Sequence, residues 1–209
     1  MSAYNTIEGR AVGEIEEKKS RFIAQLAHVE TEEEALAFLE EVRSEHRMAR
    51  HNVYAYVLRG KNGVLRVRYS DDGEPQKTAG LPTLEAIQHA KLQDIAVVVT
   101  RYFGGTLLGT GGLVRAYTQA TQAGIAAAQV VTISSCVDIT ATLAYSHYDS
   151  AVALAGKCNA KIIDTAYTSE VTMRVRMLDG TQSAFLSGLT ELCRGQERVD
   201  VSEPLDAAF

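Results

Sequence analysis

The sequence predicts an α+β protein built from two successive units, β-α-β-β-α-β-α followed by β-α-β-β-α-β. Short alternating or β-branched runs are separated by segments with apolar residues at helical spacing. A glycine-rich stretch joins an apolar strand that ends at Thr100 to a long helical pattern, which ends near residue 128. A second set of strands begins there. We therefore expect one domain over residues 1–130, a junction within residues 128–135, and a second domain over residues 131–209.

The first elements follow from local patterns. Residues 9–29 alternate well enough for a strand, and one face of it would carry Phe22, Ala24 and Leu26. Thr31 and Glu34 have the spacing of a capping box and start a helix to about Met48. The apolar residues that this helix would bury are Leu36, Leu39 and Val42. Strands at 53–59 and 64–69 flank Asn62-Gly63, a strong hairpin signal.

The rest of the first unit contains two helices around one apolar strand. Pro82 suits the first turn of a helix that is buried through Leu84 and Ile87. Residues 95–100 are apolar throughout, which is typical of a central strand. The helix after the glycines has its apolar or small positions at Leu113, Val114, Tyr117, Ala120 and Thr121.

The second unit has the order of a split β-α-β, or ferredoxin-like, domain. Its strands are expected at 137–143, 161–166, 170–177 and 197–201. One helix is expected over 146–158, with Ser146 as its N-cap, and another from about residue 179 to Cys193.

Composition excludes several protein classes. The chain has 209 residues, a formal charge of −5, and 15 of its 21 lysines and arginines before residue 130. The first domain is thus near −1 and the second near −4, so any contact with phosphate must be local. Cys136, Cys158 and Cys193 lack metal-type spacing, and their sparse, odd number suits a reducing compartment. No signal sequence and no membrane-length apolar run is present, so we expect a cytoplasmic protein that does not bind membranes.

Five glycines within nine residues are the most informative feature of the chain: Gly104, Gly105, Gly109, Gly111 and Gly112. A strand, a glycine loop and a helix together aim backbone N–H groups at an anion. Arg101 and Arg115 flank the loop and suit bidentate phosphate contacts. The loop matches neither the Walker A nor the dinucleotide pattern. The alternative is that the glycines serve only tight turns and close packing. We also predict that Gly111 and Gly112 are critical for the backbone, so that neither can carry a Cβ cheaply, with added strain if either has positive φ.

A second basic group, Lys18, Lys19 and Arg21, is expected on an early strand next to Phe22. These residues either form a solvated sheet edge or extend the phosphate-binding patch of the glycine loop. Tyr102 and Phe103 would then be available to stack on bases, while the alternative places at least one of them in the core.

An acidic turn offers a weaker candidate site. Asp71, Asp72 and Glu74 have oxygen ligands suited to a divalent cation, but such a tract more often closes a turn through side-chain-to-backbone bonds. His51 is a candidate base, and Ser70 a candidate nucleophile, without a nucleophile-elbow pattern. We therefore predict no metal, no cofactor and no catalytic residue, and keep His51, Asp71, Asp72 and Glu74 as accessory residues.

Three blocks resemble the IMPACT family, whose bacterial members include the YigZ-type proteins. They are Arg50-His51-Asn52 at a strand start, SDDGEP with TAG at residues 70–80, and TRYFGG with LLGTGGLVRAY at residues 100–117. The resemblance runs from about Lys18 to residue 128, and the second domain also fits the bacterial branch. It implies that the first domain has the fold of the second domain of a small-subunit ribosomal protein. The two domains together resemble the last two domains of elongation factor G.

The resemblance also implies a link to translation. Eukaryotic relatives regulate translation initiation by binding the activator of a starvation-responsive kinase through a chain with an additional N-terminal interaction domain. We therefore expect a regulatory binding protein that contacts RNA, the ribosome or a translation-related protein through the basic glycine-loop face. An enzyme that acts on a phosphorylated small molecule or nucleotide, and a purely protein-binding scaffold, are the alternatives. The pattern does not predict an oligomeric state.

Overall fold

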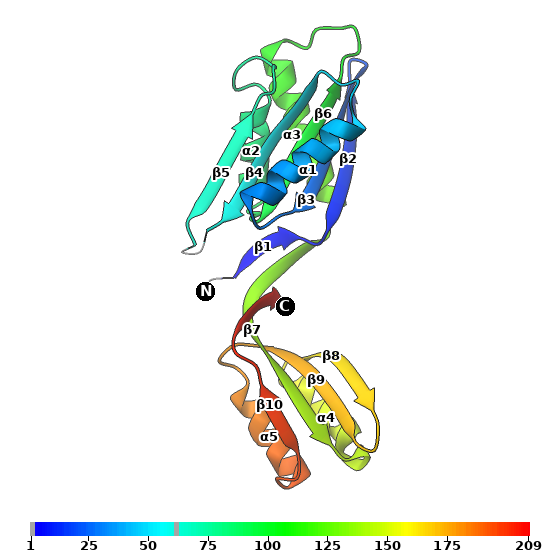
Figure 1. Cartoon of the computed structure of the whole chain (residues 1–209), viewed down its shortest axis with the longest axis vertical. Coiled ribbons are helices and arrows are strands. Elements are labelled where there is room, and N and C mark those ends of the chain that lie inside the picture. Colours follow the sequence, from blue (N-terminus) through cyan, green and yellow to red (C-terminus); the bar gives the residue numbers. More distant parts are fainter. Residues whose placement is uncertain (1–2, 61–62) are drawn as a thin grey trace. The chain divides into compact units, whose positions relative to one another are not determined.

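A computed structural model describes residues 3–60 and 63–209 (Figure 1). These residues divide into two units, one formed by Tyr4–Val131 and the other by Thr132–Phe209 together with Ala3. The predicted hairpin signal at Asn62 lies outside the described residues. The protein has the predicted α+β class, with a β/α unit followed by a β-α-β-β-α-β unit.

The N-terminal unit is a five-stranded antiparallel sheet in the order β2-β3-β6-β4-β5. Helix α1 covers one face, and α2 with α3 cover the other (Figure 1). The elements of this unit are β1 (Tyr4–Ile7), β2 (Arg10–Glu17), β3 (Ser20–His28), α1 (Glu32–Glu45), β4 (His51–Arg59), β5 (Leu65–Ser70), α2 (Gly80–His89), β6 (Ile95–Tyr102) and α3 (Gly109–Ala127).

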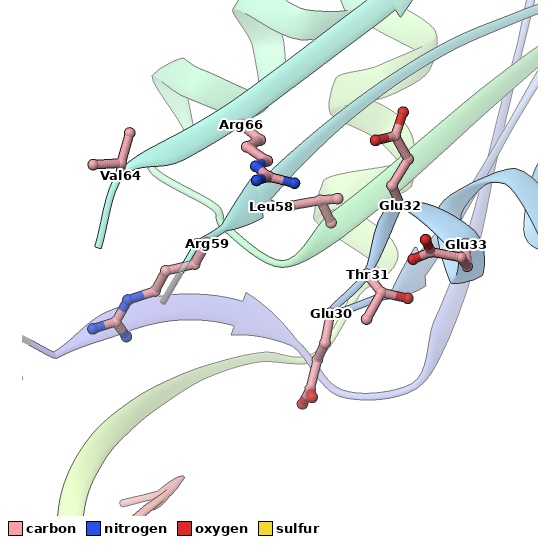
Figure 2. A pocket seen from close by; sticks show the side chains of 9 residues that line it. Glu30, Thr31, Glu32, Glu33, Leu58, Arg59, Val64 and Arg66 are labelled. Carbon is pink, nitrogen blue, oxygen red and sulfur yellow. The ribbon is translucent and has the colours of Figure 1, made fainter. Parts of the chain in front are cut away.

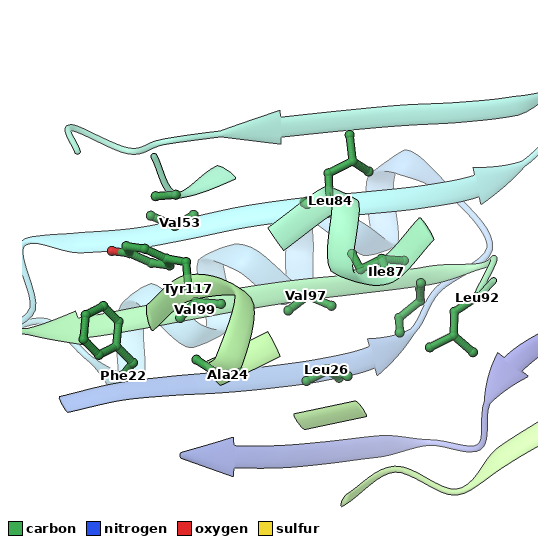
Figure 3. Close-up of a cluster of buried hydrophobic side chains, with 14 of the residues drawn as sticks. Phe22, Ala24, Leu26, Val53, Leu84, Ile87, Leu92, Val97, Val99 and Tyr117 are labelled. Atoms are coloured by element: carbon green, nitrogen blue, oxygen red, sulfur yellow. The ribbon is translucent and has the colours of Figure 1, made fainter. Parts of the chain in front are cut away.

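The larger core lies between the sheet and helices α2 and α3 (Figure 3). β6 is the middle strand of the sheet and is buried from Ile95 to Arg101, which confirms the predicted central strand. The predicted apolar face of the early strand is also confirmed, because its three residues belong to this core: Phe22, Ala24 and Leu26. Alternate residues of β3, β4 and β6 point to α1, where a second core forms around Phe38, Leu39 and Val42.

The prediction of one strand over residues 9–29 is wrong. The segment is a β2–β3 hairpin in which Glu17 pairs with Ser20 across a two-residue turn. Lys18 and Lys19 form the turn, with φ of 47° and 66°. Positive φ at both central residues matches the twist of a tight hairpin. No glycine or asparagine marks this turn, so the sequence pattern alone did not reveal it.

The capping box at the start of α1 is confirmed in one half. The Thr31 hydroxyl accepts a hydrogen bond from the Glu34 N–H at 3.2 Å. The Glu34 carboxylate accepts from the Glu30 N–H at 2.7 Å, one residue before the partner that the motif predicts. The helix ends at Glu45, and Leu36 is exposed, so the buried stripe is narrower than the sequence indicated.

The C-terminal unit has the ferredoxin-like strand order β10-β7-β9-β8, with all pairs antiparallel. Its elements are β7 (Val130–Leu143), α4 (Tyr145–Lys157), β8 (Lys161–Tyr167), β9 (Val171–Leu178), α5 (Ser183–Cys193), β10 (Arg198–Val201) and β11 (Leu205–Ala208). The N-cap prediction at Ser146 is wrong, because Ala144 occupies that position without a side-chain bond. Strand β11 was not predicted; it pairs with the first half of β7.

Candidate functional site

Three segments meet at one end of the N-terminal sheet: the glycine-rich loop after β6, the Lys18-Lys19 turn, and residues 71–79 (Figure 1). Strand register explains their meeting. Arg21 of β3 pairs with Tyr102, and His51 of β4 pairs with Arg101, so the last residues of β6 lie between the first residues of its two neighbours. We call this end of the unit the loop end.

A buried carboxylate lies directly beneath the loop end. Glu74 Oε1 accepts a hydrogen bond from Arg101 at 2.7 Å and another from the Tyr117 hydroxyl at 2.8 Å. The side chains of Glu74 and Arg101 are only 4% and 8% exposed. Burial raises the pKa of Tyr117, with the nearby Glu74 charge adding to the effect, so this hydroxyl stays a neutral donor.

Two aromatic rings lie close to the Arg101 guanidinium. Its Cζ lies 5.4 Å from the centroid of the Phe22 ring and 5.6 Å from that of Phe103. Within the described part of the chain, the buried Arg101 Nε makes no hydrogen bond, and the rings offer π density near the charge instead. The prediction that Arg101 presents its guanidinium to a phosphate beside the loop is wrong. Glu74 lies 27 positions away in the sequence, and only strand pairing reveals that it neutralises this arginine.

Three glycines shape the loop itself. A Cβ on Gly104 would lie 2.0 Å from the carbonyl carbon of Lys19, so the loop backbone lies directly against the β2–β3 turn. The Gly104 N–H also donates to Ser20 Oγ at 3.1 Å. Gly105 and Gly109 have φ of 86° and 70°, and a Cβ on either would meet no other atom within 4 Å. Glycine is favoured at these two positions because of the backbone conformation and not because of close packing.

Gly111 and Gly112 were both expected to be unable to carry a Cβ cheaply, and this prediction is wrong for Gly111. A Cβ on Gly112 would lie 3.0 Å from Leu108 Cβ, which is a tight contact. The structure places positive φ at Gly105 and Gly109, while Gly111 and Gly112 lie within the first turn of α3. A Cβ on Gly111 would lie 3.7 Å from Arg115 Nη1, an ordinary contact. The N-terminus of α3 has no side-chain cap, which leaves first-turn N–H groups open.

The basic residues at the loop end differ in availability. Arg21 is paired with Glu14 through two hydrogen bonds. Lys18, Lys19 and Arg115 are exposed, and none of them makes an ion pair within residues 3–60 and 63–209. The loop end therefore presents free positive charge at the two lysines of the hairpin and at Arg115, a residue of the second turn of α3 whose guanidinium lies beside Gly111 in the first turn.

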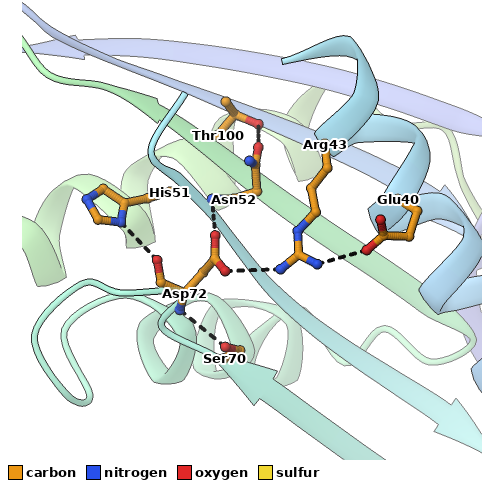
Figure 4. Close-up of polar contacts among 7 residues, drawn as sticks. All are labelled: Glu40, Arg43, His51, Asn52, Ser70, Asp72 and Thr100. Atoms are coloured by element: carbon orange, nitrogen blue, oxygen red, sulfur yellow. Dashed lines mark hydrogen bonds and ion pairs between the residues drawn. The ribbon is translucent and has the colours of Figure 1, made fainter. Parts of the chain in front are cut away.

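The acidic turn is held together by its own hydrogen bonds. Asp71 accepts from the backbone N–H groups of Lys77, Ala79 and Gly80, so its carboxylate closes the turn and starts α2. Figure 4 shows that Asp72 accepts from the Asn52 N–H at 2.6 Å and from Arg43 at 3.0 Å. The turn-forming alternative is thus observed for both aspartates.

His51 and Ser70 do not form a hydrolase pair. His51 Nδ1 lies 2.9 Å from the Asp72 carbonyl oxygen, and Ser70 Oγ accepts from the Asp72 N–H at 3.2 Å (Figure 4). Among the described residues, no group of three or more His, Cys, Asp or Glu side chains is arranged to hold a metal ion. In that same part of the chain, no helix has the length and apolar character to span a membrane.

The aromatic pair that follows β6 divides between core and surface. Tyr102 is half-buried, with its hydroxyl 3.0 Å from His46 Nδ1 and its ring edge-on to the imidazole. Phe103 is 58% exposed and Leu107 is 83% exposed. The sequence offered both aromatics for stacking, and the structure leaves Phe103 free for it.

A hollow of about 530 Å³ lies at the opposite end of the same sheet (Figure 2). Its walls carry Glu32, Glu33, Arg59 and Arg66, among others. Arg59 is the last residue of β4 and His51 the first, which separates the hollow from the loop end by about 26 Å at ordinary strand rise. The hollow is therefore not part of the loop end.

Comparison with known proteins covers both units. Residues 18–125 match the Impact N-terminal domain, and residues 142–196 match a domain of unknown function, DUF1949. The IMPACT family member YigZ of Escherichia coli (strain K12) is 38% identical over 178 residues, 85% of this chain and 87% of YigZ.

Two solved structures are similar to the chain. A crystal structure titled as that of a hypothetical protein is 36% identical with a TM-score of 0.62, and the match covers 97% of this chain and 98% of the other. The structure of the two-domain translational regulator Yih1 is 29% identical with a TM-score of 0.39, and the match covers 58% of this chain and 48% of the Yih1 chain. The family model and the similarity to YigZ together show that this chain belongs to the IMPACT family.

Proposed function

We propose that this protein is a translation-associated regulatory binding protein of the cytoplasm that contacts RNA through its loop end. In this proposal Lys18, Lys19 and Arg115 contact phosphates, together with backbone N–H groups of residues 104–112. Arg101 and Glu74 hold the loop in place from beneath, and the aspartates of the acidic turn are structural.

The single observation that carries the proposal is the free positive charge at the loop end. Three exposed cations lie around a glycine loop and an uncapped helix N-terminus, while the unit as a whole is close to neutral. Arg50 and Lys77, which border the same end, are also exposed. Cations and open N–H groups on adjacent turns suit a phosphate backbone.

Family membership supports the translation-associated part of the proposal. The resemblance to the IMPACT family implies that eukaryotic relatives regulate translation initiation. Residues 18–125, which match the Impact N-terminal domain, include the segments that form the loop end. Fold alone does not fix function, so the contact with RNA needs a direct test.

Filter binding to purified ribosomal RNA at low salt tests the proposal. The wild type should be retained with the RNA, and Lys18→Gln/Lys19→Gln/Arg115→Gln should lose most of that binding. The matched control Lys157→Gln/Arg174→Gln/Arg194→Gln removes three exposed charges from the C-terminal unit and changes net charge equally. It should bind as the wild type does. Equal binding by both triple variants, or no binding by the wild type, would contradict the proposed function.

A further inference from the structure

We propose that the loop end binds single-stranded RNA, with one unpaired base stacked on the exposed ring of Phe103 and the adjoining phosphates at Lys18 and Lys19. This inference deepens the proposed function and depends on it, since it specifies which form of RNA the loop end takes.

The Phe103 ring contacts the Arg101 guanidinium and is otherwise largely exposed. Arg101 Cζ lies over the ring, 5.6 Å from its centroid, and 58% of Phe103 is exposed. The guanidinium is held by its bond to buried Glu74 and lies 5.4 Å from the centroid of the Phe22 ring. Phe103 thus rests on a support that continues to the core through the edge-to-face contact of Phe22 with Tyr117, at 5.2 Å. A ring held in this way is a fixed stacking platform.

The neighbouring glycine sets the place of this platform relative to the two lysines. Gly104 follows Phe103 directly, and its backbone lies against that of Lys19, where any Cβ would clash at 2.0 Å. The bond from the Gly104 N–H to Ser20 Oγ holds the two turns together. The exposed Phe103 ring and the turn that carries the two lysines are therefore on adjacent segments, which lie more than 80 residues apart in the chain.

This combination selects an unpaired strand over a duplex. In a duplex the faces of the bases are covered by their neighbours, so an exposed ring has no base face to stack on. In a single strand a base can turn out, and stacking on an aromatic side chain contributes about 1–3 kcal/mol per base. Leu107, 83% exposed in the same loop, adds apolar surface beside the ring.

Fluorescence anisotropy with a labelled 12-nucleotide RNA, alone or annealed to its complement, tests the inference. The wild type should bind the single strand more tightly than the duplex, although the duplex carries more phosphates. Phe103→Leu should weaken single-strand binding by about 5- to 150-fold, which is the stacking energy expressed as an affinity ratio, and leave duplex binding unchanged. Phe103→Tyr should restore single-strand binding, because its ring can stack equally well.

Each alternative result has a distinct meaning. Equal affinity for the two RNAs, or single-strand binding by Phe103→Leu at the wild-type level, overturns the stacking assignment while salt-sensitive RNA binding still supports the proposed function. Absence of binding to both RNAs at low salt overturns the inference and the proposed function together. Unchanged duplex binding by Phe103→Leu, with a wild-type circular dichroism spectrum, shows that the variant is folded.

Discussion

Glu74→Gln tests whether the buried ion pair of Glu74 with Arg101, beneath the loop end, stabilises the fold. The substitution keeps the shape of the side chain and an oxygen that accepts from Tyr117, and it removes the negative charge that faces Arg101. Both side chains of the pair are more than nine-tenths buried. Removing one partner of such a pair leaves an uncompensated buried charge and costs about 3–5 kcal/mol. That is a large part of the ~5–15 kcal/mol that stabilises an ordinary domain.

The assay is urea unfolding followed by circular dichroism at 222 nm, because the chain has no tryptophan. Glu74→Gln/Arg101→Met should recover most of the loss, since it removes the unpaired charge and leaves an apolar side chain close to the Phe22 and Phe103 rings. Glu14→Gln, which breaks the exposed pair with Arg21, is the matched control and should unfold close to the wild type. If Glu74→Gln unfolds like this control, Arg101 is accessible to water and the structural role assigned to it is wrong.

The remaining predictions concern backbone contact, pH and domain division. Gly104→Ala should destabilise the protein by about 1–3 kcal/mol or more through its clash with Lys19, whereas Gly111→Ala should stabilise it by about 0.4–1 kcal/mol; denaturant midpoints of the two variants should shift in opposite directions. Hydrogen bonding to Arg176 lowers the pKa of Asp138 in the folded protein. The ion pair between these two residues therefore stabilises the fold fully above the unfolded-state pKa of about 3.9, and this stabilisation is lost as the pH falls through the lower folded-state pKa. Asp138→Asn should therefore destabilise the C-terminal unit at pH 7 and much less at pH 2, and an equal difference at both values would refute the argument. Limited proteolysis should yield an N-terminal fragment of about 130 residues, the size of an independent domain, and first cleavage within residues 83–117 would contradict this division.

Local patterns predicted most of the fold. The capping motif at Thr31, the apolar run of β6 and the helical spacing after the glycines are each short-range signals, and the structure has an element at each place. Errors arose where tertiary context decides. The Lys18-Lys19 turn has no glycine, and β11 is a four-residue strand that forms only by pairing with β7.

The sequence predicted which residues gather at the candidate site, but it did not predict which of them contact one another. The glycine loop and the early lysines do come together, because β3 and β6 are neighbours in the sheet. The sequence does not show that Glu74 neutralises Arg101, since the two residues meet only when the acidic turn folds under the loop. For the same reason Arg101 changes from an expected phosphate ligand to the support of Phe103.

The salt dependence of RNA binding tests the central claim most directly. Contacts with two to four phosphates of a single strand predict that the affinity falls with salt with a log–log slope of roughly −1.5 to −3. Lys18→Gln/Lys19→Gln should make the slope shallower by about 1.4, which corresponds to two lost phosphate contacts, without changing sequence preference. A wild-type affinity that does not change with salt, or the same slope in the double variant, would contradict the assignment of the loop end as the RNA-binding surface.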